Sequence, residues 1–447
     1  MTLVQPGPPS PTYVPFTEVD EAVRLLDTPS EPWSIELELA LEGRVDEGRL
    51  RQAVNRALAG HAMTRVRMLP ARRSDRRYCW QLTDGPDLDP LRVIDCPDDR
   101  ALAETRVQLL SLSVPLAESP PFRIRLARHR DGDAVMLNVN HAAFDGFGSL
   151  RLLQSIARAY RGEEDPPAPV ALDEARQVRA LLGTDDARSR AERFRALGEK
   201  VRDVVRSPAR VAVDGGQDSA GYGLEHRSLS PERTAALSAL DQPGTVNDLL
   251  LAALNLTIAG WNHDHEAPCR RIGVLMPVNL RPKAWRQDVV TNMVLMVRVS
   301  TKTDDRQDPQ ALVEAIAGQT GRVKEWGTGA SLIEVLGAVP SLPVWVKQSL
   351  SPLLWVTGNR MVDTAVLSNL GQLDEPLSFG PDAGAPTGLF FSAPARMPCG
   401  LSIGVATMAG RLHLSLRYRH PMFSEDAASR FVDRYLQDLD RLVARLG

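Results

Sequence analysis

The segment Met136-Leu-Asn-Val-Asn-His-Ala-Ala-Phe-Asp-Gly-Phe-Gly148 decides how the surrounding chain folds. Ala134 to Val139 is rich in Val and Leu and follows the turn Asp131-Gly132-Asp133, which predicts a buried strand. After the segment, apolar residues recur at helical spacing from Leu152 to Tyr160, so we expect a helix that begins near Ser149. The segment therefore contains the turn that joins a strand to a helix.

Three residues of this turn, His141, Asp145 and Gly146, are candidates for chemistry. A histidine that ends a strand beside a carboxylate and a turn glycine can act as a general base, because the acid and the glycine shape the turn that orients the ring. A lone histidine near a strand is more often structural, so the spacing alone leaves both roles open.

The stretch Asn140 to Gly146, NHAAFDG, resembles the HHxxxDG motif of condensation domains and of acyltransferases related to chloramphenicol acetyltransferase. The second His of that motif, the family's catalytic or positioning residue, corresponds to His141. The first His is replaced by Asn140, whose amide can still form hydrogen bonds, and we expect it to hold the loop. Because successive strand residues point to opposite faces, we do not expect Asn140 to face the substrate beside His141. Asp145 corresponds to the family's structural aspartate, which pairs with a distant arginine.

Four further segments resemble the same family in the same order along the chain. Pro277 to Arg281 reads "PVNLR", and Arg281 stands where the partner of the motif aspartate is found. The others are Thr291 to Val299, with Thr291 in place of the usual Gly of a "GN" strand, the "SNLG" segment Val366 to Gly371, and the closing hairpin Leu401 to Tyr418. The resemblance thus covers nearly the whole chain and identifies it as a stand-alone member of this superfamily, one that meets its donor in trans.

Composition bounds the class of protein. The chain has 447 residues, of which 43% are hydrophobic and 24% charged, an ordinary globular balance. A net charge of -3 gives no reason to expect nucleic acid or an anionic membrane as partner. The N-terminus lacks the basic and apolar regions of a signal peptide, and no apolar stretch is long enough for a transmembrane segment. We therefore expect a cytoplasmic protein.

Strand and helix patterns alternate throughout, which predicts an α+β fold. Ser34 to Leu41 alternates as a half-buried strand, and Asp46 can cap the helix that follows. The resemblance implies two lobes, each a largely antiparallel mixed sheet with flanking helices, and an active-site tunnel between them. We assign residues 1–165 to the N-terminal lobe with the NHxxxDG motif. Residues 166–222 form a linker with an exposed basic helical connection, and residues 223–447 form the C-terminal lobe.

Two patterns suggest other chemistry. Gly400-Leu-Ser-Ile-Gly404 fits the GxSxG nucleophile elbow of α/β-hydrolases. That site needs an acid and then a histidine after the serine, but no acid lies between Ser402 and His420, so we reject a hydrolase. His263-Asp-His265-Glu266 has side chains that can bind a divalent cation, but the flanking residues favour a polar surface turn, so we predict no metal site.

Two further features have both a structural and a functional interpretation. For His61 we favour a helix-end residue that bonds backbone carbonyls. The apolar region Leu332 to Val356 could line an acyl pocket, although plain core packing is the more frequent role of such a stretch.

The resemblance implies transfer of an acyl group from a thioester, on coenzyme A or on the phosphopantetheine of an acyl or peptidyl carrier protein, to a hydroxyl or amine. His141 would take the proton from the attacking nucleophile of a small-molecule acceptor, in natural-product or lipid biosynthesis. No permanently bound cofactor is implied, because the donor thioester is a substrate. The alternative is a non-catalytic module of the same fold that recruits a carrier protein or partner enzyme, which the replacement of the first motif His by Asn140 supports.

Overall fold

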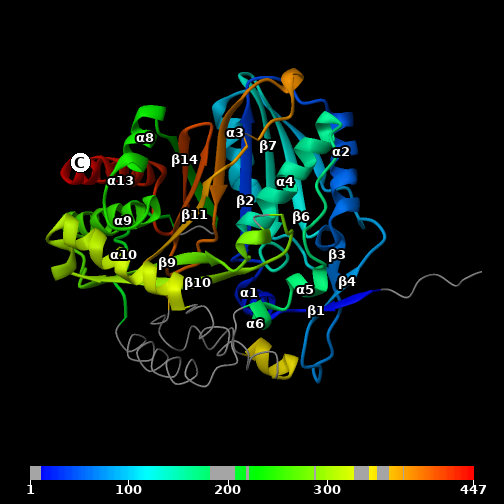
Figure 1. Cartoon of the computed structure of the whole chain (residues 1–447), viewed down its shortest axis with the longest axis horizontal. Helices are drawn as coiled ribbons and strands as arrows, with labels where there is room; N and C mark the ends of the chain where they lie inside the picture. The colour runs from blue at the N-terminus through cyan, green and yellow to red at the C-terminus, as the bar shows by residue number, and fades with distance from the viewer. Residues whose placement is uncertain are drawn as a thin grey trace, which may run out of the picture.

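The computed structural model describes residues 12–181, 207–217, 221–285, 288–326, 342–349, 362–375 and 377–447. Two large β-sheets lie in the middle of the molecule, with helices on the outer side of each (Figure 1). The fold is the mixed α+β, two-lobed architecture that the sequence predicts. No helix among the described residues combines the length and apolar character that a membrane span requires.

The first sheet has five strands in the order β12-β2-β7-β6-β5. These are β2 (Ser34–Leu41), β5 (Leu91–Cys96), β6 (Phe122–His129), β7 (Gly132–Asn140) and β12 (Pro386–Ser392). All neighbours are antiparallel except β5 and β6, which are parallel. A smaller antiparallel sheet contains β1 (Tyr13–Pro15), β3 (Val66–Met68) and β4 (Cys79–Leu82). The helices of this half are α1 (Glu18–Leu26), α2 (Glu47–Gly60), α3 (Asp99–Ser111), α4 (Gly146–Arg161), α5 (Leu172–Ala175) and α6 (Val178–Leu181).

The second sheet has six strands in the order β10-β9-β11-β13-β14-β8. These are β8 (Tyr222–Ser228), β9 (Arg271–Asn279), β10 (Val294–Lys302), β11 (Ala365–Gln372), β13 (Leu401–Met408) and β14 (Arg411–Arg419). Strand β11 is parallel to both of its neighbours, and the other pairs are antiparallel. The outer helices are α8 (Pro231–Ala239), α9 (Val246–Asp264), α10 (Pro309–Trp326) and α13 (Glu425–Leu446).

Each sheet has its own hydrophobic core. One core joins α2 and α4 to the apolar face of β2 and β7, and a smaller cluster lies under α3 on the other face. A second large core joins α9 and α13 to β9, β11, β13 and β14. Most helices therefore cover the outer faces of the two sheets, whereas α3 covers part of the inner face of the first sheet.

Helix α4 begins at Gly146, three residues before the position near Ser149 that the apolar spacing predicts. Its N-cap is Asp145, whose carboxylate accepts a hydrogen bond from the Gly148 amide at 2.7 Å. A Cβ at Gly146 would lie 2.9 Å from Leu370, and one at Gly148 would lie 2.8 Å from the Thr291 carbonyl oxygen. Because neither glycine has a side chain, the first turn of α4 can pack closely against the second lobe.

The interpretation of β2 as a half-buried strand is wrong. Its ends are as predicted and Asp46 does cap α2, but Glu36 and Glu38 are only 2% and 1% exposed. Alternation identifies two faces but does not say what covers the polar one. Here that face lies under α3, where Arg106 binds Glu38.

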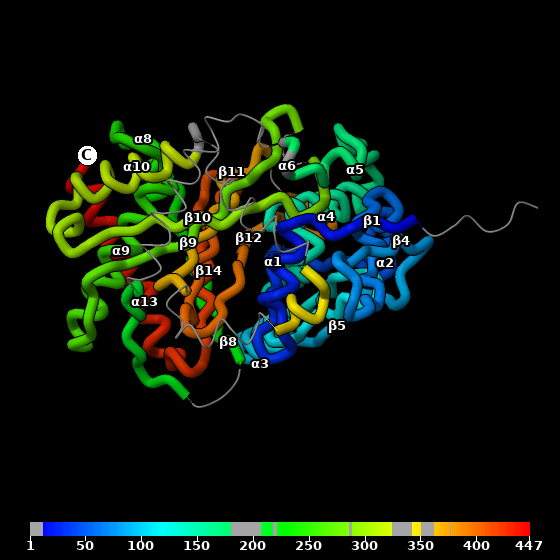
Figure 2. The backbone as a smooth tube through the Cα atoms, turned by 90° about the horizontal axis from the view of Figure 1, so that it is seen from below, coloured from blue at the N-terminus to red at the C-terminus, as the bar shows by residue number. Residues whose placement is uncertain are grey.

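Strand β12 joins the two halves of the chain. It comes from the second half but pairs with β2 and so completes the first sheet (Figure 2). The predicted boundaries at 165 and 222 stay predictions, yet the second half is not confined to its own sheet. Most of the basic connection at 175–205 and of the apolar region at 332–356 lies outside the described residues.

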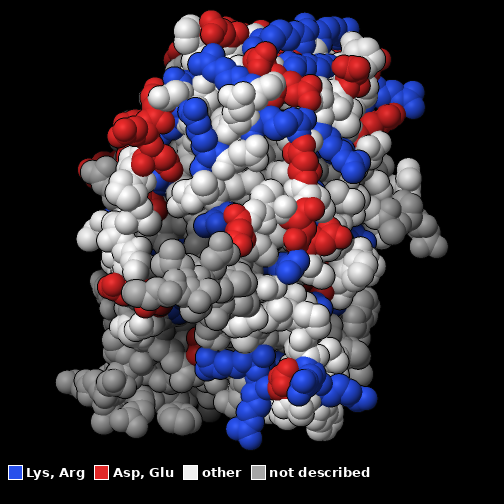
Figure 3. Space-filling model, turned by 90° about the vertical axis from the view of Figure 1, so that its right-hand side faces the viewer, with Lys and Arg blue, Asp and Glu red and all other residues white. Residues whose placement is uncertain are grey.

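The outer surface beside α2 and β4 carries charges of both signs. Positive and negative side chains are interspersed over most of this face, and basic ones gather at its lower edge (Figure 3). The loop between β3 and β4 lies at that end of the molecule and contains the exposed Arg72, Arg73, Arg76 and Arg77. The absence of a nucleic-acid partner stays a prediction.

Candidate active site

A buried ion pair fixes the loop after β7. The Arg281 guanidinium donates to both carboxylate oxygens of Asp145, at 2.7 and 3.0 Å, and both side chains have no exposed surface. Asp145 also accepts hydrogen bonds from the amides of Gly148 and Met293 at 2.7 and 2.6 Å. The pairing expected from the resemblance is therefore present, and it joins the helix start to the second lobe.

Backbone atoms of the second lobe complete the shell of this pair. The Arg281 guanidinium donates to the carbonyl oxygens of Val289 and Thr291, at 2.9 and 2.8 Å. The side-chain amide of Asn292 donates to the His141 carbonyl oxygen at 2.7 Å. Because these contacts hold the chain on both sides of the turn, the His141 backbone is locked between the lobes.

The His141 imidazole lies in a mostly apolar environment. The residue is 7% exposed, and its Nδ1 has no hydrogen-bond partner among the described residues. Burial lowers the pKa of His141 from its ordinary value, and the negative charge of Asp145 opposes this effect only in part. The imidazole is therefore neutral at physiological pH, which is the form that a general base needs.

A cavity of about 30 Å³ adjoins this imidazole at the junction of the two lobes. Its walls come from both sheets and from the start of α4. The lining residues are Ile35, His141, Gly146, Phe147, Pro277, Asn279, Val294, Met296, Ser368, Asn369, Leu370, Phe391, Ala393 and Pro394. Three polar lining residues, Asn279, Ser368 and Asn369, belong to the "PVNLR" and "SNLG" segments, but the sequence alone gives them no role at the site.

Asn140 points away from this cavity. Its Nδ2 donates to the Asp27 carboxylate at 2.9 Å and to the Val114 carbonyl oxygen at 3.0 Å. Its Oδ1 accepts a hydrogen bond from the Ala142 amide at 3.0 Å. Among the residues expected at the site, His141 and Gly146 thus line the cavity, while Asp145, Arg281 and Asn140 support the loop from behind.

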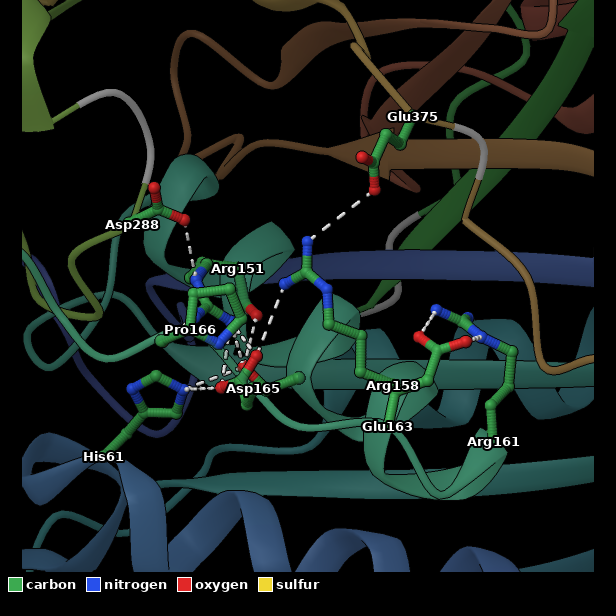
Figure 4. Close-up of polar contacts among 10 residues, drawn as sticks. His61, Arg151, Arg158, Arg161, Glu163, Asp165, Pro166, Asp288 and Glu375 are labelled. Carbon is green, nitrogen blue, oxygen red and sulfur yellow. Dashed lines mark hydrogen bonds and ion pairs between the residues drawn. The ribbon is translucent and has the colours of Figure 1, made fainter.

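The rejected hydrolase motif is structural. Ser402 lies within β13, and its buried hydroxyl donates to the Ala393 carbonyl oxygen at 2.7 Å. A second serine and histidine pair occurs at His61, whose Nε2 is 2.8 Å from the Ser155 hydroxyl and 3.2 Å from the Asp165 carboxylate (Figure 4). A catalytic triad needs its acid on the other ring nitrogen, so this is not a triad.

His61 is the predicted helix-end residue, since it caps the C-terminus of α2 and its backbone N–H donates to the Ala57 carbonyl oxygen at 3.2 Å. Its imidazole, for which the sequence gives no role, takes part in a side-chain network (Figure 4). Arg151 of α4 is fully buried, and its guanidinium binds Asp165 at 2.9 Å and Asp288 at 3.1 Å. Nearby, Arg158 binds Asp165 at 3.3 Å and lies 3.9 Å from Glu375. Because Asp288 and Glu375 come from the second half of the chain, this network is a further link between the halves.

In the His263–Glu266 turn, the imidazole of His265 already has protein partners. Both ring nitrogens of His265 are engaged, by the Asp214 carboxylate at 3.1 Å and by the Trp261 carbonyl oxygen at 2.8 Å. Elsewhere in the described residues, Asp99, His129 and Asp131 are close enough together to hold an ion, but Arg130 already contacts both carboxylates. The four cysteines are free and far from metal-binding spacing in the sequence.

Comparisons with known proteins show a full-length relative and solved structures of the same fold. No family model matches the chain. The uncharacterized protein Rv2305 of Mycobacterium tuberculosis is 34% identical over 428 residues, which cover 95% of this chain and 98% of the relative. Two solved structures share the fold at 16% identity. The first condensation domain of the calcium-dependent antibiotic synthetase, in complex with a substrate analogue, has a TM-score of 0.71 over 97% of both chains.

The second is the epimerization domain from the third module of tyrocidine synthetase B. It has a TM-score of 0.68 over 98% of this chain and 97% of that one. At such low identity these two likenesses show the fold. In this chain the motif turn follows β7, Arg281 follows β9, and "SNLG" lies in β11. The chain therefore belongs to the same family as Rv2305 and has the fold of a condensation domain.

Proposed function

We propose that this protein is an acyltransferase that moves an acyl group from a thioester to a hydroxyl or amine of a small-molecule acceptor. The donor is acyl-coenzyme A or an acyl or peptidyl group on the phosphopantetheine of a carrier protein. The observation that carries the proposal is a neutral imidazole, His141, that lines a cavity between the lobes on a loop fixed by a buried ion pair. Related condensation-domain structures make this class of reaction the natural expectation.

The proposed chemistry needs one base. As the acceptor oxygen or nitrogen attacks the thioester carbonyl, His141 takes its proton, and the thiolate leaves when the tetrahedral intermediate collapses. The imidazolium then gives the proton to the leaving sulfur, so the enzyme returns to its starting state. A positioned base of this kind contributes about 10²–10⁴ in rate. No acyl-enzyme intermediate is needed, because both substrates meet at the same imidazole.

One observation favours the second candidate, a non-catalytic module that recruits a carrier or partner enzyme. The cavity at His141 is small, with a volume of about 30 Å³. For an acyl group to enter it, we expect side chains such as Met296, Leu370 and Phe391 to change rotamer. The position of Asn140 removes the other argument for this candidate, because the replaced motif residue does not face the cavity.

The two candidates differ in the result of one substitution. The wild type and His141→Ala would be incubated with acyl-coenzyme A and with acyl-loaded carrier protein, together with a panel of alcohols and amines, and free thiol would be followed. We expect His141→Ala to lose about two orders of magnitude of acceptor-dependent thiol release or more, with an unchanged melting temperature. His263→Ala, at an exposed position, is the matched control and should keep full activity. If folded His141→Ala releases thiol at the wild-type, acceptor-dependent rate, the role of His141 is refuted. If the wild type itself shows no acceptor-dependent thiol release, the non-catalytic module is favoured.

A further inference from the structure

A polar layer lies where the inner face of the first sheet meets β14. On β2 the apolar residues, such as Ile35 and Leu37, belong to the core under α4, so Ser34 and Glu36 point to the opposite face. Ser392 of β12 is the register partner of Glu36 and shares that face. We define the polar layer as Ser34, Glu36, Ser392, Ser415 and Arg417.

Two contacts show that β14 turns its polar side toward this layer. Arg417 Nη1 donates to the Ser34 carbonyl oxygen at 2.9 Å. His413, two residues before Ser415, is on the same side of β14, and its ring lies 5.4 Å from that of Phe390 on β12. The alternate residues Leu414 and Leu416 belong to the core of the second lobe. Ser415 and Arg417 therefore face β2 and β12, which Figures 1 and 2 show beside β14.

Every member of the polar layer has a buried side-chain atom without a hydrogen-bond partner among the described residues. These atoms are Ser34 Oγ, Glu36 Oε1, Ser392 Oγ, Ser415 Oγ, and both Nε and Nη2 of Arg417. The Arg417 side chain is fully buried. Buried polar groups in folded proteins are nearly always hydrogen-bonded, so such a concentration at one place indicates a polar occupant.

Arg417 has no protein carboxylate as counter-ion. The neighbouring charges pair with each other, Arg419 with Glu31 at 2.7 Å and Arg106 with Glu38 at 2.7 and 2.5 Å. Burial and the Glu38 carboxylate raise the pKa of Glu36 to about 8, although Arg106, Arg417 and Arg125 oppose the rise. Glu36 is therefore mostly protonated at neutral pH. The buried Arg417 guanidinium then lies over the Tyr222 ring, 4.1 Å from its centroid, but lacks an ionised counter-ion, which is unfavourable for a buried charge.

The unpartnered atoms of Arg417 are the two that form one edge of a guanidinium. Nε and Nη2 point their N–H bonds the same way and bind both oxygens of a carboxylate in parallel. The same edge of Arg106 binds the Glu38 carboxylate in this protein. Arg417 thus presents to the polar layer the geometry that Arg106 uses for a carboxylate, and the hydroxyls of Ser34, Ser392 and Ser415 can donate to the same anion.

The polar layer and the His141 cavity lie on opposite faces of the first sheet and meet at the ends of its strands. Ser34 pairs with Asn140, which points away from the cavity, whereas the next residue, Ile35, lines it. Ser392 ends β12, and Ala393 and Pro394 after it line the cavity. A molecule that passes from His141 around these strand ends would therefore have its far end near Arg417.

We propose that Arg417, with the hydroxyls of Ser34, Ser392 and Ser415, binds the carboxylate of a substrate whose reacting group lies at His141. The proposal rests on the proposed acyl transfer for its substrate but not for the binding site itself. It names a substrate class: a hydroxy or amino acid as acceptor, or a dicarboxylic acyl group as donor.

A binding experiment tests the site without turnover. Thermal melting would be measured at constant ionic strength with butyrate and with butyramide, a neutral compound of similar shape. We expect butyrate to raise the melting temperature of the wild type and butyramide to leave it unchanged, because only a ligand that binds the folded state stabilises it. Arg417→Met should abolish the response to butyrate, whereas Arg233→Met, at an exposed arginine, should keep it. If butyrate does not raise the melting temperature of the wild type, water is the occupant of the polar layer and the proposal is overturned.

Two variants separate this proposal from an internal neutralisation of Arg417. In the absence of ligand, Arg417→Met should melt no lower than the wild type, because it replaces an uncompensated buried charge with an apolar side chain. Glu36→Gln should keep the wild-type response to butyrate, since Glu36 already carries a proton. If Glu36 is instead the ionised counter-ion, Arg417→Met will melt well below the wild type, and butyrate binding will appear only in Glu36→Gln. Either of these results would contradict the proposal.

Activity measurements then identify which substrate carries the carboxylate. 3-Hydroxybutyrate would be compared with its methyl ester as acceptor, and succinyl-coenzyme A with butyryl-coenzyme A as donor. We expect the wild type to prefer the carboxylate form of one pair about tenfold or more in kcat/KM, mainly through KM, and Arg417→Met to lose this preference. If butyrate binds but no acyl transfer is detected, the carboxylate-binding site is supported and only the proposed function is refuted. Transfer that shows the same preference in the wild type and in Arg417→Met would refute the role of Arg417.

Discussion

Removal of either partner of the Asp145–Arg281 ion pair should destabilise the protein strongly. Both side chains are fully buried, and the guanidinium binds both carboxylate oxygens. Removal of one partner leaves the other charge buried and unpaired, which costs about 3–5 kcal/mol. Asp145→Ala also removes the N-cap of α4, worth about 1 kcal/mol, so we expect a loss of about 4–6 kcal/mol for Asp145→Ala and about 3–5 kcal/mol for Arg281→Met.

The double variant distinguishes a coupled pair from two independent losses. Once Asp145 is absent, replacing Arg281 removes the orphaned charge, so the two effects should fall short of their sum by about 2 kcal/mol or more. Urea unfolding followed by tryptophan fluorescence measures all three variants. Asp440→Ala is the control, because Asp440 forms a similar two-oxygen contact with Arg233 at the exposed surface and should cost less than about 1 kcal/mol. Additive effects, or an Asp145→Ala loss no larger than that of Asp440→Ala, would refute the reasoning.

Two further predictions concern the loop itself. Because burial lowers the pKa of His141 below the ordinary 6.5, the imidazole stays neutral as pH falls through that value, and the acidic limb of the rate profile should lie below pH 6.5; a midpoint at or above 6.5 would contradict the burial argument. Asn140→His should raise acyl transfer by less than about twofold, because position 140 faces Asp27 and Val114 rather than the cavity, and its proton-transfer capacity is therefore out of reach of the substrate. A severalfold gain at unchanged stability would show that this position acts in proton transfer.

The elements that the sequence predicts well are those with a local signal. The strand before the motif, the capped helix after Asp46 and the closing hairpin from Leu401 occur where the patterns place them. The apolar spacing predicts a start of α4 that is three residues too late, because the first turn contains Gly146 and Gly148. Glycine is a poor helix former, but close packing requires it at both positions. The Asp145–Arg281 pair has no local signal at all, and its prediction depended on the family resemblance.

Features that depend on distant partners could not be predicted. Strand β12 contains a proline and a glycine, and it becomes a strand because it completes the first sheet beside β2. Strand β5 has charged residues at Arg92 and Asp95 and no clean alternation, and it is formed by parallel pairing with β6. Arg417 lies in the predicted closing hairpin, but no sequence pattern marks it as a binding residue. Its lack of a counter-ion arises only when the lobes pack together.

The links between the lobes limit how substrates can enter. The Asp145–Arg281 pair, the pairing of β12 with β2, and the contacts of Arg151 and Arg158 with Asp288 and Glu375 all cross between the halves of the chain (Figure 4). Separating the lobes would break the buried pair together with the backbone hydrogen bonds between β12 and β2. Rotation of a few apolar side chains around the cavity costs far less, about 0.5–1.5 kcal/mol for a strained rotamer. We therefore expect the substrates of the proposed transfer to reach His141 by local rearrangement of the cavity wall, while the two lobes keep the turn that holds the imidazole in place.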